Sequence, residues 1–104
     1  MSKNNNLILK EKFTLAVQNQ QKGNFEVAKN LYNKILEVEP SFIDAQSNLG
    51  NIFKELGENQ KAISCYEKAI EIDPNILSAH NNLGVLFNKL GKKKRSNKLL
   101  QKSN

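Results

Sequence analysis

The sequence predicts an all-α protein, an α-solenoid in which pairs of helices stack one after another along an axis. Two observations lead to this prediction. The segments SNLGNIFKELG at 47–57 and NNLGVLFNKLG at 81–91 agree at six of eleven positions and start 34 residues apart. Apolar residues recur at spacings of three and four, as on one face of a helix, and no segment shows the alternation of a strand.

The 34-residue spacing extends beyond these two segments. It also relates Gly23 to Gly57, Ala28 to Ala62, Tyr32 to Tyr66 and Pro40 to Pro74. A fixed period of this size is typical of helical repeat proteins. It divides the chain into a lead-in at 1–8, a first unit at 9–42, a second unit at 43–76, and an incomplete third unit at 77–104 that carries a basic C-terminal helix.

Each unit is expected to contain two helices joined by a short turn. In the second unit, apolar residues at helical spacing run from Ala45 to Leu56 and again from Ala62 to Ile70. Gly57 separates the two runs, as a residue just beyond a helix end often does, and Pro74 cannot continue the second helix. The same reasoning over three units predicts six helices, near 7–22, 25–38, 42–56, 59–72, 76–90 and 92–102.

Composition excludes several classes of protein. No apolar run is long enough to cross a membrane, and the first residues lack the pattern of a signal peptide. Cys65 is the only cysteine, so no disulfide can form within the chain, which fits a reducing compartment. We therefore expect a cytoplasmic protein without a membrane span.

The net charge of +6 is confined to the C-terminal residues. Residues 1–91 hold ten basic and ten acidic side chains, so the excess lies in 92–104. We interpret 92–102 as a solvated last helix, because the aromatic residues that stack on bases are missing there. A contact with phosphate or acidic lipid stays open, and nucleic acid is not the expected partner. The uncapped end also allows weak self-association.

Catalytic chemistry is not expected. The chain has one histidine, His80, and it lies in a different predicted helix from Cys65, with no evident third group. A metal site would need several ligands, and no cluster of cysteine and histidine exists. No glycine-rich phosphate loop occurs. We predict no enzyme activity, catalytic residue, metal, cofactor or small-molecule substrate.

The second unit resembles the tetratricopeptide repeat (TPR), a 34-residue helix–turn–helix motif. The residues that match the motif are Leu49, Gly50, Phe53, Gly57, Ala62, Tyr66, Ala69 and Pro74. Gln46 departs from it, because the motif places a bulky side chain there. The first unit matches less well. The third has Ser96 for the alanine and Leu100 for the aromatic residue. The phrases NNLG and SNLGN are most similar to the repeats of O-GlcNAc transferases and related bacterial proteins.

The resemblance implies that the first helix of each unit lines a concave groove that binds a partner peptide. The groove residues that it implies are Asn48, Asn51, Lys54, Asn81, Asn82 and Asn88. An asparagine amide both donates and accepts, so it can hold a peptide backbone without reading its sequence. Asn48 and Asn82 match the asparagine ladder of O-GlcNAc transferases. Because asparagine is a poor helix former, changing both to alanine is expected to leave stability intact.

Another TPR subclass binds the acidic C-termini of heat-shock chaperones through lysine, asparagine and arginine side chains. The matching positions here are Phe13, Val17, Asn51, Asn81 and Val85. Only Asn51 fits, so this partner class is not expected.

The sequence thus predicts a non-catalytic protein–protein interaction module, a scaffold that binds a protein or peptide in the concave groove. One alternative stays open. The chain could be the recruiting arm of a larger or split transferase that moves a glycosyl, sulfo or methyl group.

Overall fold

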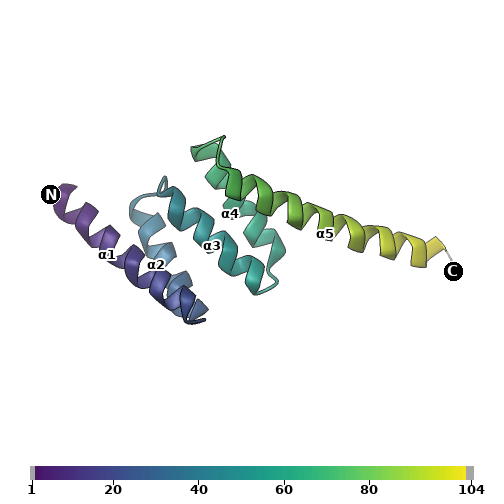
Figure 1. Ribbon diagram of the computed structural model, residues 1–104, viewed down its shortest axis with the longest axis horizontal. Coiled ribbons are helices and arrows are strands. Elements are labelled where there is room, and N and C mark those ends of the chain that lie inside the picture. Colours follow the sequence, from purple (N-terminus) through teal and green to yellow (C-terminus); the bar gives the residue numbers. More distant parts are fainter. Residues whose placement is uncertain (1, 103–104) are drawn as a thin grey trace.

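A computed structural model describes the backbone of residues 2–102 and the side chains of residues 6–91. Over these residues it contains five helices and no strand. The helices are α1 (Ser2–Gln21), α2 (Phe25–Val38), α3 (Ile43–Glu55), α4 (Asn59–Ile72) and α5 (Leu77–Lys102). In Figure 1, α1, α3 and α5 form one layer, and α2 and α4 lie behind them. The predicted all-α solenoid is confirmed.

Each helix packs against the next one in the chain, so the molecule is long and narrow, 63 × 29 × 19 Å. Its core runs along the whole stack as one cluster. Tyr32 and Tyr66 are fully buried at equivalent positions, and so are Ala28 and Ala62. The small alanines let neighbouring helices approach closely, while the tyrosines fill the space between units.

The turns within the first two units form at the predicted glycines. Gly23 has φ +81° and Gly57 has φ +76°, a left-handed conformation that glycine adopts without strain. The N–H of the following residue then bonds to a carbonyl five residues back, from Asn24 to Asn19 and from Glu58 to Phe53, both at 2.8 Å. These bonds close α1 and α3 in the same way.

The predicted turn at Gly91 does not form. The helix that starts at Leu77 continues to Lys102, and its far half projects beyond the other helices (Figure 1). Gly91 is followed by lysines and an arginine, which are good helix formers. The repeat positions that would anchor a returning helix hold Ser96 and Leu100, in place of the alanine and tyrosine of the earlier units. A returning helix would bury less apolar surface here, so folding it back would gain less free energy.

The prediction of six helices is therefore wrong at the C-terminus, where two predicted helices are one. At the other end, α1 begins at Ser2 rather than near 7. No described helix is both long and apolar enough to span a bilayer.

Candidate functional site

The six residues predicted to bind a peptide lie on two helices of the same layer. Asn48, Asn51 and Lys54 belong to α3, at successive spacings of three residues that keep them on one side of the helix. Asn81, Asn82 and Asn88 belong to α5. The structure joins some of these side chains directly and leaves others on the surface.

A chain of hydrogen bonds connects α4, α3 and α5. The Tyr66 hydroxyl donates to Oδ1 of Asn51, and Nδ2 of Asn82 donates to the same oxygen at 3.2 Å. Nζ of Lys54 donates to Oδ1 of Asn82 at 3.0 Å. We call these four residues the α3–α5 polar chain; Tyr66 is fully buried, and the other three are partly buried. They fix the orientation of two amides and one positive charge between the second and third units.

A related arrangement joins the first and second units. Nδ2 of Asn48 donates to the Tyr32 hydroxyl at 3.2 Å, and that hydroxyl donates to Oε1 of Gln20 at 2.6 Å. Val17 occupies the position that Asn51 has in the second unit, so Tyr32 turns to Gln20 instead. Asn48 and Asn82 thus both bond to the preceding units, although their partners differ.

Asn81 and Asn88 stand apart from these networks. Both are exposed on α5, and neither side chain makes a hydrogen bond within residues 6–91. Of the six predicted residues, the structure therefore brings together Asn51, Lys54 and Asn82. It places Asn48 at the previous interface and leaves Asn81 and Asn88 facing solvent.

The hydroxyls of Tyr32 and Tyr66 belong to these networks, although they were not predicted from the sequence. Burial raises the pKa of Tyr66 to about 12, with a further contribution from Cys65. Burial also raises the pKa of Tyr32, and the hydrogen bond from Asn48 opposes part of that rise. Both hydroxyls therefore stay neutral near pH 7. The 34-residue recurrence of tyrosine was the available signal, because a buried tyrosine hydroxyl usually has a polar partner.

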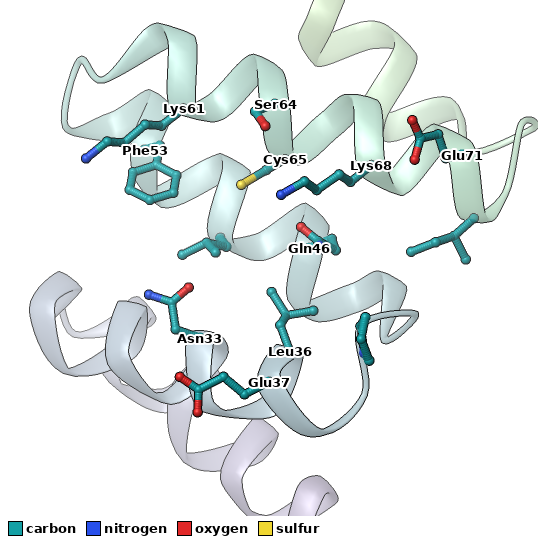
Figure 2. Close-up of a pocket in the computed structure, with 13 residues that line it drawn as sticks. Asn33, Leu36, Glu37, Gln46, Phe53, Lys61, Ser64, Cys65, Lys68 and Glu71 are labelled. Carbon is teal, nitrogen blue, oxygen red and sulfur yellow. The ribbon is translucent and has the colours of Figure 1, made fainter.

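A cleft of about 780 Å³ lies on the opposite layer, between α2 and α4 (Figure 2). Its floor is formed by Gln46, Leu49 and Phe53 of α3. The walls are formed by Asn33, Leu36, Glu37 and Pro40 on one side, and by Lys61, Ser64, Cys65, Lys68, Glu71 and Ile72 on the other. This cleft was not predicted from the sequence. The one feature of the sequence that pointed to it is Gln46, which occupies a position where the repeat motif has a bulky side chain.

The residues suited to catalysis do not come together. Burial raises the pKa of the Cys65 thiol to about 11, which the charge of Lys68 partly opposes. The raised pKa makes Cys65 a poor nucleophile at neutral pH. Nε2 of His80 lies 2.8 Å from the carbonyl oxygen of Pro74, at the start of α5. Among the described residues, no group of three histidine, cysteine or acidic side chains is placed to hold a metal.

Comparison with known proteins supports the repeat interpretation. Residues 50–91 match a family model described as a TPR repeat. The crystal structure of MamA protein superposes with a TM-score of 0.77 at 24% identity, covering 90% of this chain and 51% of that one. None of the curated proteins is significantly similar in sequence.

A second solved structure is the first TPR of Spaghetti (RPAP3) bound to the HSP90 peptide SRMEEVD. It superposes with a TM-score of 0.74 at 25% identity, covering 77% of this chain and 64% of that one. The present chain thus spans about half of the MamA chain and just under two thirds of the RPAP3 chain. The family match and these structural similarities support a tetratricopeptide repeat protein.

Proposed function

We propose that the chain is a non-catalytic interaction module, a cytoplasmic scaffold that binds a partner peptide on the face formed by α1, α3 and α5. The α3–α5 polar chain is the observation that carries this proposal. It holds the amides of Asn51 and Asn82 and the ammonium group of Lys54 in fixed orientations. Groups that are already ordered lose little entropy when a partner binds. The RPAP3 structure, which holds a peptide, supports the same use.

The polar chain leaves hydrogen-bonding capacity for a peptide. The Lys54 ammonium has three N–H groups and donates one to Asn82. The amide of Asn51 accepts two bonds through its oxygen and keeps its N–H groups for another acceptor. Peptide carbonyl oxygens are suitable acceptors. Asn81 and Asn88 extend the polar surface along α5.

The asparagines would hold the peptide backbone as a ladder, in the way suggested by the resemblance to O-GlcNAc transferase repeats. An acidic chaperone C-terminus is not the proposed partner, because Phe13, Val17 and Val85 occupy positions that would need polar or cationic side chains. Weak self-association would use α5 itself, where Val85 and Phe87 are exposed.

Photo-crosslinking from two positions tests which face binds the partner. A benzoylphenylalanine placed at Asn88, on the proposed face, is expected to attach a partner protein in extracts of the source cell. The same group at Lys34, an exposed residue of α2 outside both the proposed face and the cleft, is the matched control. Mass spectrometry of the crosslinked peptides identifies the partner. Equal yields of one partner from both positions would contradict the proposal.

A further inference from the structure

One side of α5 is uncovered, although the same side of α3 is buried. It consists of four residues at helical spacing, which we call the open stripe: His80, Gly84, Phe87 and Gly91. Their equivalents 34 residues earlier are Gln46, Gly50, Phe53 and Gly57. In the second unit, α4 covers this side, and the Tyr66 ring lies against Gly50. As a result, Phe53 is only 9% exposed, whereas Phe87 is 52% exposed.

The uncovered side is the place that the second helix of unit three would occupy. In Figure 1, α2 and α4 lie behind the other layer, and the far half of α5 projects away from both of them. A Cβ at position 84 would meet nothing within 4 Å. A half-exposed phenylalanine next to an open glycine on the same helix is a surface on which another helix can pack.

The open stripe is complementary to itself. Large and small residues alternate along it, in the order histidine, glycine, phenylalanine, glycine. If a second copy of α5 runs antiparallel, with a two-fold axis between positions 85 and 86, each large residue faces a glycine. Phe87 of one copy then faces Gly84 of the other, and His80 faces Gly91. The contact is isologous, because both copies use the same surface.

The charges at the two ends of α5 favour the same pairing. Residues 92–102 hold six basic side chains and no acid. In the antiparallel pairing, position 98 of one copy is level with position 73 of the other, so this segment passes the C-terminal end of α4. Residues 67–79 there are net acidic, with Glu67, Glu71 and Asp73 against Lys68. The C-terminus of α4 adds negative charge, and its last turn has no basic residue.

We propose that α5 is a dimerisation helix, which pairs antiparallel with α5 of a second copy through the open stripe. The proposal deepens the self-association proposed above, on which it rests, and it does not involve the peptide face. The pairing covers positions 77–94 of each copy, about 27 Å of helix. One such helix pair buries less area than a stable dimer interface, so the dimer is weak and dissociates on dilution.

Sedimentation equilibrium of the full chain tests the dimer. Wild type is expected to show a reversible equilibrium between one and two copies. Phe87→Glu should weaken the dimer at least about tenfold, because the ring no longer packs on Gly84. Gly84→Leu fills the space for that ring and should weaken it about 5- to 100-fold.

Leu15→Glu is the matched control for Phe87→Glu. Leu15 lies on α1, outside the open stripe, and is 48% exposed. Its replacement should leave the dimer constant unchanged. The proposal is overturned if wild type stays monomeric up to its solubility limit, or if Leu15→Glu weakens the dimer as much as Phe87→Glu does.

Ionic strength tests the part played by the charges. Glu71 is exposed at the end of α4, so Glu71→Lys should weaken the dimer about two- to fivefold at low salt. The difference from wild type should vanish at high salt, because salt screens exposed charges. A dimer that Glu71→Lys strengthens at low salt would contradict the proposed register.

Engineered cysteines test the direction of the pairing. In a Cys65→Ala background, one protein carries His80→Cys and another carries Gly91→Cys. A Cβ at position 91 meets nothing within 4 Å, so the new side chain is accommodated. Under mild oxidation, the mixture should form a disulfide-linked dimer, and each protein alone should form far less. A mixture that does not link, or variants that link to themselves equally well, would overturn the antiparallel pairing. Neither experiment contains a partner peptide, so failure of the dimer is distinguishable from failure of the peptide face.

Discussion

Replacing Gly50 by leucine is expected to destabilise the protein by on the order of 2 kcal/mol or more, although leucine is the better helix former. A Cβ at position 50 would lie 2.8 Å from Cε1 of Tyr66 and 3.1 Å from two further ring carbons. The Tyr66 ring is fully buried, and its hydroxyl is bonded to Asn51. The ring therefore cannot move aside without breaking other contacts.

Gly84 provides the matched control, because it occupies the same repeat position one unit later. A Cβ at position 84 meets nothing within 4 Å, since α5 does not turn back to cover that side. Gly84→Leu is expected to leave stability unchanged or to raise it by up to about 1 kcal/mol through helix propensity. Urea denaturation of both variants measures the difference. Equal effects would contradict the packing difference between the two units.

The second large effect concerns the asparagines. Changing Asn48 and Asn82 together to alanine is expected to lower the free energy of unfolding by about 1–3 kcal/mol, because each internal hydrogen bond contributes about 0.5–1.5 kcal/mol. The change removes the bond from Asn48 to Tyr32 and the bonds of Asn82 with Asn51 and Lys54. The better helix propensity of alanine offsets part of this loss.

This expectation replaces the one drawn from the sequence, which gave the two asparagines a role in binding alone. In the structure they also join adjacent units. Denaturation curves of each single variant and of the double variant measure the contribution. An unchanged midpoint for the double variant would show that these bonds contribute no more than the gain in helix propensity, and would contradict the expected loss.

The repeat period explains what could be predicted. Residues that recur every 34 positions, such as Gly23 with Gly57 and Tyr32 with Tyr66, have equivalent places in the fold. The period does not predict the structure at Gly91. This residue is at the repeat position of Gly57, but it lies within a continuous helix instead of a turn. The outcome there depends on the residues that follow, because a turn forms only where the returning helix can bury enough apolar surface.

The candidate sites were predictable only in part. Helical spacing placed Asn51 and Asn82 on neighbouring helices, but it could not tell which hydrogen bonds their amides would form. The first unit has Val17 at the position where the second unit has Asn51. Tyr32 therefore donates to Gln20, whereas Tyr66 donates to Asn51, although the helices are alike. The cleft arises from the spacing of α2 and α4 above Gln46, and this spacing is a property of packing rather than of one residue's identity.

The most direct test of the account is the affinity of the crosslinked partner for a variant that leaves the internal networks intact. Asn81 and Asn88 are exposed, and neither side chain makes a hydrogen bond within the described part of the chain. Asn81→Ala combined with Asn88→Ala should therefore keep the wild-type stability or raise it slightly, because alanine is the better helix former. If the face of α1, α3 and α5 binds the partner, the double variant should weaken binding about 5- to 100-fold in a calorimetric titration. Unchanged affinity, with the fold intact, would contradict the account.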